Sequence, residues 1–429
     1  MKKLVRNGRY LSWEDGTPFF YLGDTAWEIF HKLNREELEK YLSCRARQGF
    51  TVIQGVLLAE MEGVTVPNAY GRLPLEFREG LPAPEIPDVA GEYSYWDHVD
   101  FALELAAEHG LFFALLPTWG DKFNRLWGKG PEIFTEENAY HYGKWLGERY
   151  KNQWNIIWML GGDRPLEEKH RRIVDQMAKG IREADSDHRI TFHPVGSTNS
   201  TQFVGDAPYI DFHTAQTGHG VDQTYASDEV MRQMAAACEN PFLDSEPRYE
   251  DHPACFREKI GYYWNAEDVR QNLYWDLFAG ASGHTYGNHC VWSMNRERSG
   301  YFPYTWDEVL EHPGAEQVRF AKELRLRRDY FSLEYAPELL EGNFSGMGHM
   351  VAAKGKGYAY VYSPLGIPFT VNLDGFAGAY AVRALWFDPR TGEETIFGIL
   401  PANGSATLAP PTQGKGQDWV LILEEFLDI

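Results

Sequence analysis

The chain has 429 residues, of which 15% are aromatic and 24% are charged, and its formal net charge is −21 at pH 7. This length exceeds that of one compact domain, so we expect one large domain and one small one. The negative charge disfavours binding to nucleic acid or to an anionic membrane, because both would repel the protein. An acidic surface that only keeps the protein in solution explains the charge equally well.

The first residues of the chain do not form a signal-peptide pattern. Basic residues occur among the first nine positions, but no apolar stretch of sufficient length follows, and no other segment is suited to span a bilayer. Cys44, Cys238, Cys255 and Cys290 lie far apart without CxxC spacing, which disfavours a disulfide framework and a zinc site. We therefore expect a reduced, cytoplasmic protein.

Apolar strands alternate with amphipathic helices along the first three quarters of the chain. Such alternation is typical of a parallel sheet covered by helices, and eight units predict a (β/α)8 barrel, the TIM barrel. Neither GxGxxG after the first strand nor GxxxxGK[ST] occurs, so a nucleotide-binding open sheet has little support. The predicted strands are 18–27, 51–58, 111–116, 155–161, 189–194, 209–214, 241–246 and 283–288. The predicted helices include 96–109, 136–150, 166–184, 226–238 and 266–278.

A long segment, residues 59–95, follows the second predicted strand and contains Pro and Gly. Long loops in compact domains are often functional, so we expect this loop to form a wall of the cleft.

The sequence pattern changes in the last quarter of the chain. Short segments of alternating polarity occur at 358–363, 369–373, 380–387 and 419–423, with turn residues between them. We therefore predict a barrel domain over residues 1–336 and a small, all-β antiparallel sandwich over residues 337–429. The second domain has no evident catalytic cluster.

Two carboxylates follow predicted strands of the barrel. Asp163 comes after Gly161 and Gly162, and Glu246 lies in the segment Asp244-Ser245-Glu246-Pro247. Asp163 alone would more readily cap the next helix, but Glu246 supplies a second carboxylate at the same face, where barrel enzymes build their sites. Such a pair suits the cleavage of a glycosidic bond, with one carboxyl protonated and the other ionised, and either could hold the proton.

Aromatic and polar side chains occur at the other strand ends. Aromatic rings stack on sugar faces, and amides, imidazoles and carboxylates bind hydroxyl groups. Each residue also has a structural alternative: Asp24 could cap a helix, His213 could be a bonded core residue, and Trp292 could serve packing. Their joint position favours a carbohydrate-binding cleft. The predicted substrate-binding residues are Asp24, Trp27, Gln54, Trp119, Asp121, His213, Gln216, His284, Tyr286, Asn288 and Trp292.

Motifs for other chemistries are missing from the sequence. His284 and His289, or Asp211 and His213, could be considered as metal ligands, but no HExxH or comparable spacing occurs. No Gly-x-Ser-x-Gly elbow supports a serine hydrolase. We therefore expect neither a metal nor a cofactor.

Four segments resemble glycoside hydrolase family 140, the apiosidase-like group, and the resemblance covers about residues 8 to 425. In these relatives a C-terminal β domain often carries a collagen-binding label, which does not imply collagenase activity. The segments are Leu22-Gly23-Asp24-Thr25-Ala26-Trp27, Trp158 to Asp163, Asp244-Ser245-Glu246-Pro247 and Gly283-His284-Thr285-Tyr286-Gly287.

The resemblance implies a (β/α)8 hydrolase that acts on pectic oligosaccharides, with apiose linked to galacturonic acid as the best-known substrate. It also implies that Asp163 is the acid/base and Glu246 the nucleophile. Retaining barrel glycosidases usually carry Asn-Glu at the position of Gly162-Asp163. The Asp side chain is shorter than that of Glu, and this difference affects the distance between the two carboxyls, which decides between retention and inversion.

We therefore predict a cytoplasmic, metal-independent glycoside hydrolase of pectin degradation that works with two carboxylates, by retention in the favoured scheme. Three alternatives remain: a carbohydrate-binding protein on an enzyme-like barrel, a hydrolase of a different glycoside, and an adhesion protein that acts through the C-terminal domain.

Overall fold

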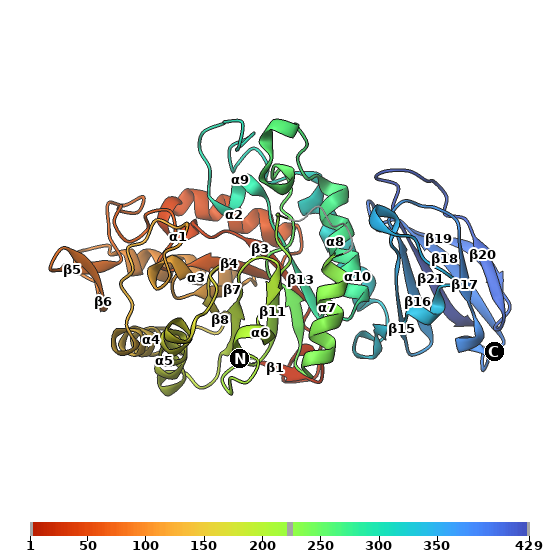
Figure 1. Cartoon of the computed structure of the whole chain (residues 1–429), viewed down its shortest axis with the longest axis horizontal. Helices are drawn as coiled ribbons and strands as arrows, with labels where there is room; N and C mark the ends of the chain where they lie inside the picture. The colour runs from red at the N-terminus through yellow and green to blue at the C-terminus, as the bar shows by residue number, and fades with distance from the viewer. Residues whose placement is uncertain (1–2, 221–225, 427–429) are drawn as a thin grey trace.

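The computed structural model describes residues 3–220 and 226–426. A β/α barrel comes first, and an antiparallel β domain, blue in Figure 1, follows it. The barrel sheet contains eight parallel strands, which are β3 (Tyr21–Thr25), β4 (Val52–Val56), β7 (Phe112–Leu116), β8 (Ile156–Gly161), β9 (Arg189–His193), β11 (His213–Gln216), β12 (Phe242–Asp244) and β13 (Gly283–Tyr286).

Side-chain hydrogen bonds connect β9 with β11 and with the residue that precedes β11, where the two ends of the sheet meet. The hydroxyl of Thr191 donates to the carbonyl of Phe212 over 2.7 Å, and the hydroxyl of Thr214 donates to the carbonyl of Phe192 over 2.6 Å. A short strand, β10 (Thr198–Asn199), pairs antiparallel with the end of β11. The predicted (β/α)8 barrel is confirmed.

One predicted strand is displaced along the chain. Residues 209–214 were expected to be a strand, whereas β11 begins at His213. The reason is Asp211, whose carboxylate accepts a hydrogen bond from the backbone N–H of Ile190 over 2.7 Å and fastens this segment to the start of β9.

Helices cover the outside of the barrel (Figure 1). Several of them begin with a capping box, in which the N-cap side chain and the third helical residue bond each other's backbone N–H, and examples start at Asn34, Ser94, Thr135 and Asn265. The helices are α1 (Ile29–Lys32), α2 (Arg35–Arg47), α3 (Tyr95–Glu108), α4 (Glu136–Tyr150), α5 (Glu168–Ala184), α6 (Thr201–Val204), α7 (Ala226–Ala237), α8 (Ala266–Phe278), α9 (His289–Trp292) and α10 (Pro313–Leu326).

Alternation along the strands divides the apolar side chains between two cores. On β8, Ile157 and Met159 belong to the cluster that fills the barrel, whereas Trp158 and Leu160 pack into the larger cluster beneath the helices. All four side chains are buried. Since β8 is held on both faces, the position of its end, just before Asp163, is well determined.

The long loop after β4 has its own structure. It contains a hairpin of β5 (Leu75–Arg78) and β6 (Leu81–Pro87), which was not predicted because three prolines interrupt the second strand. The first part of the loop is tied to the barrel. The buried carboxylate of Glu28 accepts a hydrogen bond from the backbone N–H of Met61 over 2.9 Å, and the ring of His31 is bonded to the carbonyl of Val66 at 3.0 Å.

The C-terminal β domain is a sandwich, as predicted. One face of its larger sheet packs against the barrel, where Tyr362 stacks on Tyr274 with ring centroids 4.9 Å apart. The other face shares an apolar core with β17 and β20. The larger sheet contains β14 (Glu334–Tyr335), β15 (Val351–Gly355), β16 (Tyr358–Ser363), β18 (Ala381–Phe387), β19 (Glu394–Leu400) and β21 (Trp419–Phe426), and the smaller contains β17 (Phe369–Asn372) and β20 (Ser405–Leu408).

A separate N-terminal hairpin, β1 (Leu4–Asn7) and β2 (Tyr10–Trp13), precedes the first barrel strand. Among the residues that the structure describes, no helix has the length and apolar character needed to cross a membrane.

Candidate active site

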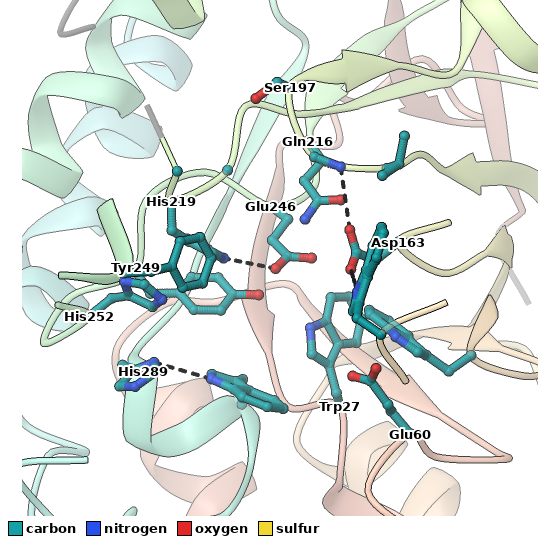
Figure 2. Close-up of a pocket in the computed structure, with 18 of the residues that line it drawn as sticks. Trp27, Glu60, Asp163, Ser197, Gln216, His219, Glu246, Tyr249, His252 and His289 are labelled. Carbon is teal, nitrogen blue, oxygen red and sulfur yellow. Dashed lines mark hydrogen bonds and ion pairs between the residues drawn. The ribbon is translucent and has the colours of Figure 1, made fainter. Parts of the chain in front are cut away.

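A pocket of about 500 Å³ opens at the carboxyl end of the barrel strands. Its walls come from the segments that follow the strands, which is where barrel enzymes place their chemistry. Asp163 and Glu246, the two predicted catalytic carboxylates, both line it, and Figure 2 shows their carboxyl groups turned toward the same cavity.

Two glycines lead the chain from β8 to Asp163. Gly161 and Gly162 have φ angles of 93° and 116°, a region that only glycine adopts readily. A Cβ atom on Gly162 would also lie 2.7 Å from the backbone nitrogen of Gly120. This turn brings Asp163, itself at φ 52°, to the pocket. Asp163 does not cap helix α5, since the N-cap residue of that helix is Glu167.

The carboxylate of Asp163 has three donors around it. The indole N–H of Trp127 and the Nη1 of Arg164 donate to Oδ2 over 3.3 and 3.1 Å, and the backbone N–H of Gly196 donates to Oδ1 over 3.3 Å. Burial nevertheless raises the pKa of Asp163, and the negative charge of Glu246 raises it further, while Arg164 and His193 oppose the change. Asp163 is therefore the carboxyl that more readily keeps a proton.

The backbone around Glu246 is held by neighbouring strands. The amide of Gln54, on β4, donates to the carbonyl of Ser245 over 2.9 Å, and the backbone N–H of Ser245 donates to the carbonyl of Ala215 over 2.8 Å. Asp244 accepts a hydrogen bond from the backbone N–H of Glu246 over 3.1 Å. These bonds fix the backbone on both sides of Glu246 and so give its side chain a defined direction.

Two histidines contact the carboxylate of Glu246. His219 Nε2 is hydrogen-bonded to Oε1 at 3.0 Å, and His193 Nε2 lies 3.0 Å from Oε2. Burial alone would raise the pKa of Glu246, but these two imidazoles lower it to about 2. Glu246 is therefore still ionised at pH values at which Asp163 holds its proton.

Further histidine rings form the opposite side of the pocket. His219 stacks on His252 with centroids 4.6 Å apart, and His252 meets His289 edge-on at 4.4 Å. Burial lowers the pKa of His252 and lowers that of His289 to about 3, so both rings are neutral near pH 7. The indole N–H of Trp292 donates to His289 Nδ1 over 3.4 Å. Neutral rings of this kind can bond hydroxyl groups without adding charge.

Four of the eleven predicted substrate-binding residues line the pocket: Trp27, Trp119, Gln216 and Trp292. The other seven lie outside its lining and have partners within the protein. These partners are Arg45 for Asp24, Tyr21 and Ser245 for Gln54, Lys122 for Asp121, Ser200 for His213, Asp276 for His284, Glu250 for Tyr286 and Asp251 for Asn288.

Two of these seven residues hold segments of the chain that carry residues of the pocket. Gln54 bonds the segment that carries Glu246, as described above. Asp121 is fully buried, pairs with Lys122 at 2.7 Å and accepts a hydrogen bond from the backbone N–H of Gly130 over 2.7 Å. That bond closes the loop that carries Trp127 over the pocket. The carboxylate at this strand end therefore positions a wall of the pocket.

Several lining residues were not predicted. Glu60 belongs to the long loop that was expected to form a wall, but no residue of that loop was singled out. His289 was considered only as a metal ligand. The lining residues that the sequence analysis missed include Glu60, Trp127, Ser197, His219, Tyr249, His252, Phe256, His289 and Tyr301. Most of them lie in irregular segments, and only the aromatic content of those segments pointed toward a cleft.

No group of three or more His, Cys, Asp or Glu side chains is arranged to hold a metal ion in residues 3–220 and 226–426.

The barrel with paired carboxylates at its carboxyl end defines the class of protein, and solved structures agree. One described as "Glycoside hydrolase" is 30% identical to this chain, covers 99% of it and 97% of its own length, and has a TM-score of 0.89. A glycoside hydrolase family 5 structure from Bacteroides vulgatus ATCC 8482 is also 30% identical, with coverage of 99% and 93% and a TM-score of 0.89. This chain is a glycoside hydrolase.

Its family follows from the match to family models. The model described as "Apiosidase-like, catalytic domain" matches residues 5–332, and the one described as "Putative collagen-binding domain of a collagenase" matches residues 338–424. The chain belongs to the apiosidase-like family.

More distant structures share the fold only. An endo-1,4-beta-D-mannanase from Thermotoga petrophila RKU-1 is 12% identical, covers 71% of this chain and 100% of its own, and has a TM-score of 0.51. No curated protein sequence matches the chain.

Proposed function

We propose that this glycoside hydrolase cleaves short pectic oligosaccharides, with a terminal apiose on galacturonic acid as the first candidate, by a retaining mechanism. Asp163 acts as the acid/base and Glu246 as the nucleophile. The observation that supports the assignment is the pair of opposite pKa shifts in one pocket: that of Asp163 is raised and that of Glu246 is lowered to about 2. An acid and an ionised nucleophile are what this chemistry requires.

In the first step the proton of Asp163 passes to the glycosidic oxygen as the bond from that oxygen to the anomeric carbon breaks. An oxygen of Glu246 forms a bond to the anomeric carbon from the opposite face. The aglycone leaves with the proton, and the sugar remains as an ester of Glu246.

In the second step Asp163, now ionised, takes a proton from a water molecule. The water oxygen bonds to the anomeric carbon, and the ester bond to Glu246 breaks. The sugar leaves with its original configuration, and both carboxyls return to their starting states. His219 and His193 favour Glu246 as a leaving carboxylate, because they stabilise its negative charge.

The rest of the pocket suits a carbohydrate. Trp27 and Trp119, with ring centroids 5.1 Å apart, and Trp292 offer apolar faces, while Gln216 and the neutral histidines offer polar groups. The volume lies in the range of pockets that hold small molecules. We place the enzyme in the cytoplasm, acting on imported fragments; cell fractionation with an antibody tests this.

The function is tested with a panel of defined pectin fragments. Mass spectrometry would identify the released sugar, and proton NMR during the first minutes would give its anomeric configuration before mutarotation. We expect release of one terminal sugar with retained configuration. Release of the inverted anomer would exclude Glu246 as a nucleophile, and a lack of release from every pectic fragment would exclude the proposed substrate class.

A further inference from the structure

Arg164 joins two carboxylates at the edge of the pocket. Its Nη1 donates to Oδ2 of Asp163 over 3.1 Å, and its Nη2 donates to Oε1 of Glu60 over 2.8 Å. The guanidinium is buried and lies over the ring of Trp127, 4.4 Å from the centroid. One cation is thus shared by two acids that both line the pocket.

We propose that Glu60 is a positioning residue for the acid/base step, which it serves by holding the second donor arm of Arg164 and so preventing that cation from pairing with Asp163 alone. The proposal rests on the role given to Asp163 in the proposed function. Glu60 acts through Arg164, so it need not touch the reacting atoms.

The position of Glu60 is built into the fold. The next residue, Met61, is tied by its backbone N–H to the fully buried carboxylate of Glu28 over 2.9 Å. Figure 2 shows Glu60 near Trp27 on the same side of the pocket as Asp163. The loop therefore presents this carboxylate to Arg164 from a fixed anchor.

The reason for a shared cation is electrostatic. A buried guanidinium that had only Asp163 as partner would strongly favour the ionised carboxylate. Asp163 would then lose its proton at a lower pH and would be a poorer general acid. A negative charge on Glu60 offsets the cation and repels a second charge on Asp163. The close approach of Gly128, whose Cβ would lie 2.5 Å from Arg164 Nη2, confines the guanidinium to this arrangement.

Glu60 carries its full negative charge only above neutral pH. Burial raises its pKa to about 7, with Arg164 opposing and Asp121 and Asp163 adding to the increase. The effect of Glu60 on Asp163 therefore grows as the pH rises through 7. Asp121 is itself paired with Lys122, and Glu246 and His193 are the other charged or titratable groups that act on Asp163. Arg164 is thus the cation that Glu60 and Asp163 have in common.

The direction of the effect follows. If Glu60→Gln removes the negative charge, Arg164 stabilises the carboxylate of Asp163 without opposition, and the pKa of Asp163 falls. A general acid is active only while it is protonated, so the alkaline limb of the kcat/KM profile moves to lower pH. With an effective dielectric constant near that of a protein surface, we expect a shift of about one pH unit, or about tenfold in proton affinity.

The test measures Asp163 directly. The intact protein is labelled with 13C at the aspartate carboxyl carbon, and the Asp163 resonance is assigned by its loss in Asp163→Asn. Its titration midpoint is then compared between the wild type, Glu60→Gln and Glu62→Gln. Glu62 is an exposed residue on the same loop and serves as the matched control. Thermal unfolding checks that the variants are folded, and Glu60→Ala, which also removes the charge and should give the same shift, provides a second variant if Glu60→Gln does not fold.

We expect the midpoint to fall by about one unit in Glu60→Gln and to stay within about 0.2 units of the wild-type value in Glu62→Gln. An unchanged midpoint in a folded Glu60→Gln would overturn the proposal, and an equal shift in Glu62→Gln would do so as well. Since the NMR titration needs no substrate, it separates this inference from the proposed function. If the wild type cleaves a pectic fragment but Glu60→Gln leaves the Asp163 midpoint unchanged, only the role of Glu60 is refuted. If the midpoint shifts but the wild type cleaves no pectic fragment, only the pectic substrate is refuted.

Discussion

Asp163 and Glu246 carry the same chemical group in different surroundings. Asp163 is partly buried near another carboxylate, which favours its protonated form, while Glu246 lies between two imidazoles, which favour its ionised form. In the proposed mechanism, the difference between the acid and the nucleophile therefore comes from their neighbours.

Replacing either carboxyl should remove activity and leave the fold intact. We expect Asp163→Asn to lower kcat/KM by about 10²- to 10⁴-fold on a substrate whose leaving group needs a proton. Glu246→Gln should lower it by about 10⁴-fold or more. Steady-state kinetics on the identified substrate, with circular dichroism as the folding control, would check this. Near-normal turnover by either folded variant would contradict the assignment.

The histidines around Glu246 should determine the acid limb of the pH profile. A nucleophile must be ionised, so kcat/KM falls as the pH drops through its pKa, which is held at about 2. Removing one donor in His219→Phe should raise that pKa by about one unit and move the limb to higher pH. Measurements of kcat/KM between about pH 3 and 6 would show it. The exposed His141, changed to Phe, is the control, and a limb that does not move would argue against the histidine contact.

At the scale of elements, the end of β8 determines where Asp163 lies. The turn at Gly161 and Gly162 combines left-handed backbone with close contact to the neighbouring chain at Gly120. A β-strand followed by such a turn can place one side chain accurately, because both faces of the strand are packed.

We expect Gly162→Ala to destabilise the protein by about 2 kcal/mol or more, since the new Cβ meets both a steric clash and an unfavourable φ. It should also lower kcat, because it displaces Asp163. Gly71→Ala is the matched control: Gly71 has a φ of 72°, but nothing lies within 4 Å of an added Cβ. Urea denaturation measures the free energy of unfolding of both variants. Equal losses of stability in the two variants would show that the contact at Gly120 contributes nothing.

At the scale of the whole molecule, a buried ion pair links the barrel to the β domain. Arg270 on α8 donates to both oxygens of Asp418, just before β21, over 3.0 and 2.6 Å, and both side chains are buried. Together with the stacked rings of Tyr274 and Tyr362, which belong to one hydrophobic cluster, this pair holds the β domain against the barrel.

Asp418→Ala should therefore destabilise the protein by about 3 to 5 kcal/mol, because Arg270 would remain buried without its counter-charge. Differential scanning calorimetry would record this as a lower unfolding temperature. The control is Asp307→Ala, which removes an exposed partner of Lys40 and should cost less than about 1 kcal/mol. If the two variants unfold at the same temperature, the buried pair does not stabilise the junction.

Much of this molecule could be predicted from local patterns. The alternation of apolar strands and helices predicted the barrel, and alternating short segments predicted the β sandwich. Asp163, Glu246, Trp27, Trp119, Gln216 and Trp292 were placed at the pocket because parallel strands bring their carboxyl ends to one face.

Residues whose role depends on a distant partner could not be assigned in this way. Asp24 and Asp121 stand at strand ends like Asp163, yet their side chains turn to Arg45 and Lys122 inside the protein. Glu60 and Trp127 lie in irregular loops, where no periodicity indicates direction. Their places depend on contacts with Glu28 and Asp163, which are remote in the sequence.

The sequence by itself determined the order of strands and helices in the barrel and the end of the barrel at which the pocket lies, because periodicity and strand order are local properties of the chain. Only the tertiary structure decided which strand-end side chains face the pocket, and which carboxyl is protonated. Both depend on burial and on charges brought together from distant segments, such as His219 against Glu246 and Arg164 between Asp163 and Glu60.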